Sequence, residues 1–180
     1  AEQPTQIAER FAMVPDCPIC VPLGAHLSCG VVGKRARCVA LGKNLIVQAA
    51  AHHSYCDLRI VVLCEQEETA QWEFCRWLPH CWDEGHTARL IANTPETIRA
   101  LLERLEPVFS ARAAAGQNAG LGAAPRAKPW YLFVCAAPET VTQHAFMKFL
   151  TANRRELGIS VLYLFDRIDL LPEECHDILD

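Results

Sequence analysis

Residues 30–45 read GVVGKRARCVALGKNL, so that a short apolar run ends in a Gly-Lys pair and leads into a helix-like stretch. A phosphate-binding loop begins in this way, because its glycines let backbone N–H groups surround the phosphates and its lysine reaches the β and γ oxygens. The pattern G-x-x-x-x-G-K-[ST] also needs a hydroxyl that holds Mg²⁺. Here only two residues separate Gly30 from Gly33, and Lys34 is followed by Arg35. The sequence therefore predicts a turn in the position of a phosphate loop but without its chemistry.

Neither the second Gly-Lys pair nor the strand ends supply the missing groups. The second pair, Gly42 and Lys43, is followed by Asn44 and falls inside the expected helix. A metal-supporting carboxylate should follow a second buried strand, but the expected strand at residues 58–63 is followed by Cys64 and Glu65. Glu65 could orient a water molecule, whereas Cys64 stands where the carboxylate should be. Asp166, after a later strand, could cap that strand or face a pocket.

We therefore predict a vestigial nucleotide pocket formed by Gly33, Lys34, Arg35 and Glu65. No catalytic residue, no bound metal and no cofactor are expected in this domain, because the missing metal ligands outweigh the position of the turn. The residues leave one alternative open, a functional or regulatory ATP-binding site in which the same four side chains act in altered geometry.

The sequence contains ten cysteines, which raises the question of metal binding. Cys17 and Cys20 have the spacing of a zinc knuckle or a redox pair. A zinc site needs two more ligands, and the candidates contain no second C-x-x-C: they are His52, His53 and Cys56, or Cys75, His80 and Cys81. A zinc-dependent interaction module is thus a second alternative. Cysteines inside apolar runs, such as Cys64 and Cys135, are expected to be reduced and to pack as small hydrophobes.

The composition suits one compact domain. The chain has 180 residues, of which 51% are hydrophobic. Seventeen basic and 21 acidic residues give a net charge of −4 without long blocks of either sign, which argues against a surface that coats nucleic acid. No apolar run approaches the roughly 20 residues that cross a bilayer. The abrupt start at Ala1 leads us to expect a soluble segment of a longer protein.

Apolar runs alternate with helical patterns along the chain. Strands are expected at residues 27–32, 58–63, 89–92, 130–135, 160–165 and 176–179. Helices are expected at residues 37–51 and 68–78, from Thr94 past Phe109, and from Thr140 to near Gly158. The runs LRIVVL, WYLFVC and SVLYLF are typical of strands that are covered on both faces of a parallel sheet. The alternation predicts a three-layer α/β fold with helices on both faces of a mostly parallel sheet.

Two segments stand out from this alternation. Residues 113–129, AAAGQNAGLGAAPRAKP, are rich in Ala, Gly and Pro, and we expect a flexible loop or disordered insertion within a single domain at residues 1–180. The segment WEFCRWLPHCW contains Trp72, Trp77 and Trp82. Its rings could pack on the sheet or form a docking surface, and Trp82 is expected to be the most exposed.

Four quoted segments carry a family resemblance: HHSYCDLRIVVL, WEFCRWLPHCWD, ELGISVLYLFDRIDLLPEEC and the degenerate GVVGKRA. Together they resemble the EssC/EccC family, the membrane-anchored FtsK/SpoIIIE-type ATPases of type VII secretion systems. The resemblance covers about residues 10–180, with residues 113–129 as the main departure. It is to the domain that follows the transmembrane helices and precedes the tandem motor domains.

The resemblance implies a RecA-like (P-loop NTPase-like) fold with degenerate nucleotide motifs, and it transfers no catalytic residue. The parent protein would be a hexamer-forming ATPase, using ATP and Mg²⁺, that exports small WXG-type proteins. This domain, which we expect not to be an enzyme, would lie at the cytoplasmic face of the cell membrane. It would couple the membrane anchor to the motors, and its partners would be other domains and subunits of the ATPase and membrane components of the secretion system.

Overall fold

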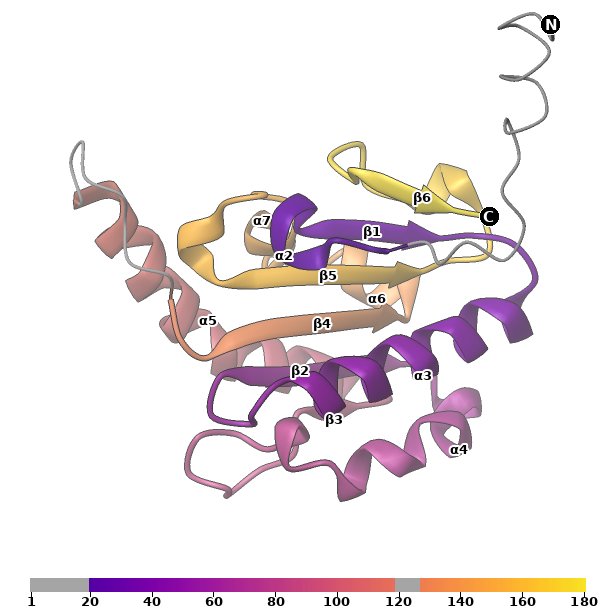
Figure 1. The fold of residues 1–180 in the computed structure, drawn as a ribbon, viewed down its shortest axis with the longest axis horizontal. Helices are drawn as coiled ribbons and strands as arrows, with labels where there is room; N and C mark the ends of the chain where they lie inside the picture. Colours follow the sequence, from indigo (N-terminus) through magenta and orange to yellow (C-terminus); the bar gives the residue numbers. More distant parts are fainter. Residues whose placement is uncertain (1–19, 119–126) are drawn as a thin grey trace, which may run out of the picture.

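A single parallel sheet organises the chain (Figure 1). The computed structural model describes residues 20–118 and 127–180. Within these ranges the strands lie in the order β3-β2-β4-β5-β1-β6, and every pair is parallel. They are β1 (Ser28–Val31), β2 (Leu58–Cys64), β3 (Ile91–Ala92), β4 (Trp130–Ala136), β5 (Ile159–Leu164) and β6 (Asp177–Leu179). The predicted strands are confirmed, with ends that differ by one or two residues.

Helices cover both faces of the sheet (Figure 1). They are α2 (Leu23–His26), α3 (Arg35–His52), α4 (Thr69–Trp72), α5 (Pro95–Asn118), α6 (Pro138–Thr142) and α7 (Met147–Leu150). Five 3₁₀ turns accompany them: η1 (Gln66–Glu68), η2 (Glu73–Trp77), η3 (Pro79–Cys81), η4 (Arg155–Leu157) and η5 (Ile168–Leu170). Side chains of α3 and α4 pack on one face of the sheet, and those of α5, α6 and α7 pack on the other. The predicted three-layer, RecA-like α/β fold is confirmed.

Helix α3 approaches the sheet closely through a glycine. A Cβ added at Gly42 would lie 2.5 Å from Cδ1 of Leu164 and 3.3 Å from the ring of Trp72. The absence of a side chain at this position therefore lets the helix lie against β5. The second Gly-Lys pair lies inside α3, as predicted, and its glycine serves packing.

The predicted loop at residues 113–129 is partly wrong, because α5 continues to Asn118. Residues 113–118 are helical, and residues 119–126 lie outside the described residues. Alanine has the highest helix propensity, which outweighs the glycine in this stretch. Gly116 also sits against the chain of η4, since a Cβ there would lie 2.7 Å from Cγ of Glu156.

The predicted helix from Thr140 to Gly158 is broken into α6, α7 and η4. Thr142 donates its hydroxyl to the carbonyl of Pro138 over 2.7 Å, and the N–H of Phe146 donates to Nδ1 of His144 over 3.1 Å. Such local side-chain bonds compete with the helical ladder and end the short helices. The predicted helix at residues 68–78 is likewise a single α turn followed by η2.

Trp77, and not Trp82, is the exposed ring of the tryptophan-rich segment. Trp77 is 85% exposed, whereas Trp72 is 1% exposed and packs in the core. Trp82 is half-buried because the guanidinium carbon of Arg89 lies 3.7 Å from its ring centroid. An antiparallel bridge between Trp82 and Arg89 holds the two residues opposite each other. The prediction that Trp82 is the most exposed ring is therefore wrong. Its cation–π contact with Arg89 explains why it is half-buried.

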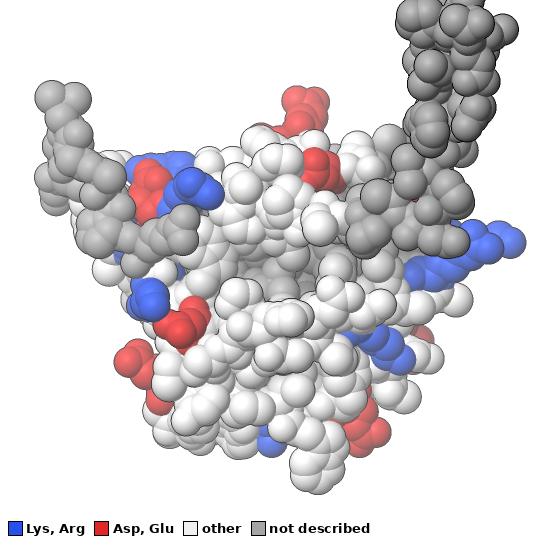
Figure 2. Space-filling model, viewed as in Figure 1, with Lys and Arg blue, Asp and Glu red and all other residues white. Residues whose placement is uncertain are grey.

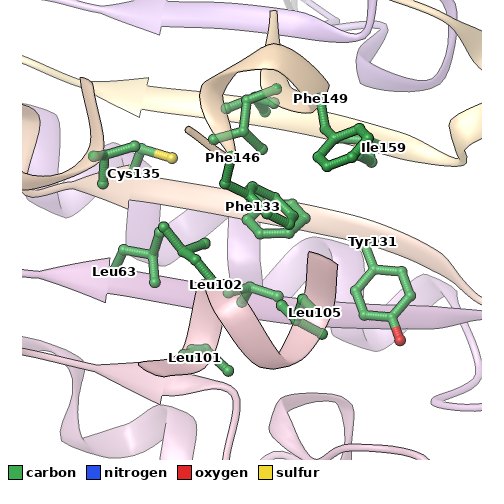
Figure 3. Close-up of a cluster of buried hydrophobic side chains, with 14 of the residues drawn as sticks. Leu63, Leu101, Leu102, Leu105, Tyr131, Phe133, Cys135, Phe146, Phe149 and Ile159 are labelled. Atoms are coloured by element: carbon green, nitrogen blue, oxygen red, sulfur yellow. The ribbon is translucent and has the colours of Figure 1, made fainter. Parts of the chain in front are cut away.

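The larger core cluster is centred on Phe109 of α5. Its ring centroid lies 5.2, 5.9, 5.5 and 6.1 Å from those of Tyr131, Phe133, Phe146 and Phe149. Figure 3 shows Leu102 and Leu105 of α5 pointing toward Phe133 of β4. The helix, the central strand and the α6–α7 segment thus share one aromatic cluster.

Replacing Phe109 by Ala should lower the free energy of unfolding by about 3–5 kcal/mol, because a fully buried ring is lost and a cavity remains. Chemical denaturation measures the change. The matched control is Val108→Ala, next along α5 and 38% exposed, which should cost about 0.5 kcal/mol. Equal losses in the two variants would contradict this description of the core.

Candidate functional site

The carboxyl ends of the parallel strands meet at one edge of the sheet, where α3 begins directly after β1. Ligands of open α/β sheets bind at this edge. The turn between β1 and α3 contains Gly33 and Lys34, and the first helical residue is Arg35. The edge also receives residues that follow β2, β4 and β5. It is therefore the first place to look for a functional site.

The backbone of the turn is bound to the protein itself. Gly33 has φ of +113°, a conformation that favours glycine. Its N–H donates to the carbonyl of Asp166 over 3.4 Å, and the N–H of Val32 donates to the carbonyl of Leu179 over 2.9 Å. A phosphate loop would direct such amides at the phosphates. Here two of them are already bonded within the chain.

The guanidinium of Arg35 occupies the space in front of α3. It donates to both carboxylate oxygens of Glu68, each over 2.5 Å, so that the pair is bidentate. It also donates to the carbonyl of Leu164 over 2.5 Å and to that of Ala136 over 2.6 Å. Asp166 lies 4.0 Å from Nη1 of Arg35. One side chain thus joins α3 to η1 and to the ends of β4 and β5.

The charge of Arg35 is stabilised by its partners. Burial by itself would lower the pKa of Arg35, but the hydrogen bond and charge of Glu68, with smaller contributions from Asp166 and Cys38, leave that pKa raised. Two of the residues predicted for the nucleotide pocket, Arg35 and Lys34, therefore have different surroundings. Arg35 is bound internally, whereas Lys34 is exposed at the start of α3.

The hollow beside Arg35 is acidic. It has a volume of about 450 Å³ and is lined by five carboxylates and two other residues: Glu65, Glu67, Glu68, Glu139, Asp166, Arg35 and Pro138. Burial raises the pKa of Glu65, and the neighbouring charge of Glu67 raises it further. The structure thus brings Arg35 and Glu65 to one hollow. The sequence analysis did not foresee Glu68 as the partner of Arg35.

These residues do not fit a magnesium nucleotide. No hydroxyl follows Lys34, the guanidinium of Arg35 is already bonded to a carboxylate and two carbonyls, and the hollow would oppose phosphate charge with five carboxylates. Two turn amides bind carbonyls of the chain. The edge thus has the position of a nucleotide site and a different chemistry.

The described thiols show no metal or nucleophilic arrangement. Within residues 20–118 and 127–180, no three His, Cys, Asp or Glu side chains are grouped to hold a metal ion. Cys17 lies outside the described residues, so the prediction for the pair that it forms with Cys20 stays a prediction. Cys81 is buried, and its pKa is raised by a hydrogen bond with Cys75 and by burial, which leaves it unreactive.

A second hollow lies on the face of the sheet between α2 and α3. It has a volume of about 600 Å³, and its walls include Leu23, Leu45, Leu132 and the ring of Trp130. Figure 2 shows a recess in the nearly uncharged centre of this face. Nothing in the sequence pattern signalled it, because its walls come from segments far apart in the chain. Among the described residues, no helix is both long and apolar enough to cross a membrane.

The fold and this edge define a P-loop-like α/β domain in which Arg35 and two amides after β1 are bonded within the chain. No family model matches the chain. The chain is 26% identical over 178 residues to the ESX secretion system protein EccC of Geobacillus thermodenitrificans, covering 99% of the chain and 12% of the relative. It is 23% identical over 176 residues to the type VII secretion system protein EssC of Staphylococcus aureus, covering 97% of the chain and 12% of the relative. The chain is therefore similar to EssC/EccC-type secretion proteins over nearly its whole length, and it spans about 12% of the length of these relatives.

The pair of Arg35 and Glu68 should contribute to stability as a unit. Their side chains are 27% and 20% exposed. The energy of their interaction should therefore lie between the values typical of exposed and of buried ion pairs. A double-mutant cycle with Arg35→Gln and Glu68→Gln should give a coupling free energy of about 1–3 kcal/mol. The control cycle uses the exposed pair of Arg167 and Asp169, in which a smaller coupling is expected. Denaturant unfolding gives both values, and equal couplings would contradict the bracing role of Arg35.

Glu65 should make stability depend on pH. Its folded pKa lies above the ordinary value of 4.5, so the stability that it contributes is present below that value and is lost as the pH rises through the folded pKa. Glu65→Gln should therefore raise the denaturation midpoint at pH 7, with a gain that disappears below about pH 4. Glu103→Gln on the exposed face of α5 is the control. The same pH dependence of stability in both variants would contradict a raised pKa at Glu65.

Proposed function

We propose that this domain is a non-catalytic, ATPase-like module of a type VII secretion protein that acts through contacts with neighbouring domains and subunits. The observation that carries the proposal is the set of bonds made by Arg35. Its guanidinium follows directly after the turn at Gly33 and Lys34, and it is bonded to Glu68 and to the carbonyls of Leu164 and Ala136. An ATPase fold that closes its own nucleotide edge keeps its architecture for another purpose.

Exposed apolar side chains support a role in contacts. Trp77 is 85% exposed on η2, and Ile168 is 62% exposed on η5. Large aromatic side chains are enriched among the residues that dominate protein interfaces. The two residues lie at different parts of the sheet, after β2 and after β5, so that one domain could contact two neighbours.

Under this proposal the domain couples a membrane anchor to motor domains during the export of WXG-type proteins. It acts at the cytoplasmic face of the cell membrane, inside a larger protein that forms hexamers and hydrolyses ATP elsewhere in its chain. The names and coverage of the relatives support this assignment. The domain needs no cofactor in this role, because movement passes through contacts between rigid parts.

One observation favours a second candidate, a regulatory ATP site. Helix α3 has no acidic residue in its first turn and no side-chain cap, and Lys34 and Arg37 are exposed there. Basic residues oppose the helix dipole at this end unless an anion is bound. An ATP molecule could then lie outside the Arg35 pair, with Gly33, Lys34 and Glu65 beside it.

Isothermal titration calorimetry with ATP and Mg²⁺ on the 180-residue chain tests the two candidates. The non-catalytic module should show no binding at micromolar concentrations, because the acidic hollow and the bonded Arg35 leave no place for phosphates. Arg35→Ala should not create ATP binding, because the carboxylates that line the hollow remain.

Matched lysine variants make the experiment specific. Micromolar binding that is lost in Lys34→Ala and kept in Lys43→Ala, the lysine of the second Gly-Lys pair, would overturn the non-catalytic role in favour of the regulatory site. ATP hydrolysis that falls in Glu65→Gln would have the same meaning. The absence of any binding heat in the wild-type chain and in all variants supports the first candidate.

A further inference from the structure

Arg59, the second residue of β2, is a charged side chain buried at the amino end of the sheet. Only 4% of its surface is exposed, and it shares a face of β2 with Val61 and Leu63. Within residues 20–118 and 127–180 its Nε and Nη1 atoms are buried and have no hydrogen-bond partner. A buried guanidinium without a counter-ion is costly. Arg59 therefore has hydrogen-bond donors that no described residue satisfies.

Aromatic rings and a second arginine surround Arg59. Its guanidinium carbon lies 6.0 Å from the ring centroid of Tyr55, and the strand register places it opposite Tyr131 of β4. The guanidinium carbon of Arg112 lies 5.2 Å from the same Tyr131 ring. Burial raises the pKa of Tyr131, while both arginines act to lower it. Tyr131 thus lies beside the guanidinium of Arg112 and opposite Arg59 in the strand register.

The second arginine is held in place without losing its charge. Nη1 of Arg112 donates to the carbonyl of Leu157 over 2.8 Å, and Nη2 donates to that of Pro129 over 2.9 Å. Carbonyl groups orient a guanidinium but do not neutralise it.

The nearby carboxylates form no ion pair with Arg59 or Arg112 among the described residues, although the charge of Glu84 acts on Arg112. Asp83 and Glu84 both act on Tyr131 from the loop that covers this end of the sheet. The carboxylate of Asp83 already accepts bonds from the backbone of Thr87 and Ala88 and from the Thr87 hydroxyl. Glu84 is exposed. Arg59 is included in none of the ion pairs formed between described residues.

We propose that Arg59 and Arg112 form a binding site for an oxyanion, a phosphate or carboxylate group, that enters beside Tyr55 and the loop at residues 83–88. Tyr55 is 42% exposed, and its ring centroid lies 6.1 Å from that of His86. These two side chains form the cover that an entering anion displaces. Guanidinium groups are well suited to such ligands, because charge-assisted bonds to oxyanions are strong and directional. The site lies at the opposite end of β2 from Glu65 and is independent of the function proposed above.

Thermal unfolding of the 180-residue chain in inorganic phosphate, compared with NaCl at equal ionic strength, tests the site. At ten times the dissociation constant, phosphate should raise the melting temperature by about 3–6 °C over NaCl. Arg59→Met, which keeps an unbranched apolar stem and removes the guanidinium and its charge, should abolish the rise. Without phosphate it should melt at the wild-type temperature or higher, because an unpaired buried charge is removed.

Arg99→Met on the exposed face of α5 is the matched control and should keep the full response. Arg59→Lys retains a charge without the guanidinium and should keep only part of it, which serves as the test if Arg59→Met does not fold. Sodium acetate at equal ionic strength distinguishes the source: a response to phosphate alone supports a phosphate ligand, and an equal response to acetate supports a carboxylate. Equal melting temperatures of the wild-type chain in all three salts, or a full phosphate response in Arg59→Met, would overturn the proposal.

Discussion

The bonds of a single guanidinium determine what the carboxyl edge of this sheet can do. Arg35 connects the start of α3 to Glu68 and to the last carbonyls of β4 and β5. A nucleotide-binding fold normally leaves this space open and lines it with free donors. Here the guanidinium of Arg35 and the N–H groups of Val32 and Gly33 are bonded to the chain. The edge is therefore a structural joint, and the surrounding carboxylates give it negative charge.

The sheet separates charges of opposite sign along one strand. Glu65 follows β2 at the carboxyl edge, and Arg59 lies near the amino end of the same strand. At about 3.3 Å per residue, the two are about 20 Å apart. Between them the strand is buried on both faces. The two ends of the domain can thus interact with ligands or partners of opposite charge without competing for them.

The fold was predictable from the sequence because its strands are continuous apolar runs, whereas the contacts at the site depend on three-dimensional neighbours. LRIVVL, WYLFVC and SVLYLF each form a central strand. The degenerate turn at Gly33 was visible as missing residue types, but Glu68 lies 33 residues from Arg35, and no local pattern links them. Trp82 was misjudged because its cover comes from Arg89. Arg59 gave no signal, since one arginine in an apolar run does not reveal whether its charge is paired.

The edges of the sheet limit how the domain can meet its neighbours. The outermost strands are β3, with two residues, and β6, with three. Such short edges offer few unpaired N–H and C=O groups, so an incoming chain has little template for extending the sheet. Main-chain augmentation and the edge-to-edge aggregation that accompanies it are thereby disfavoured. Any association of this sheet with another chain would therefore depend on side chains, and it would leave the backbone of the sheet unchanged.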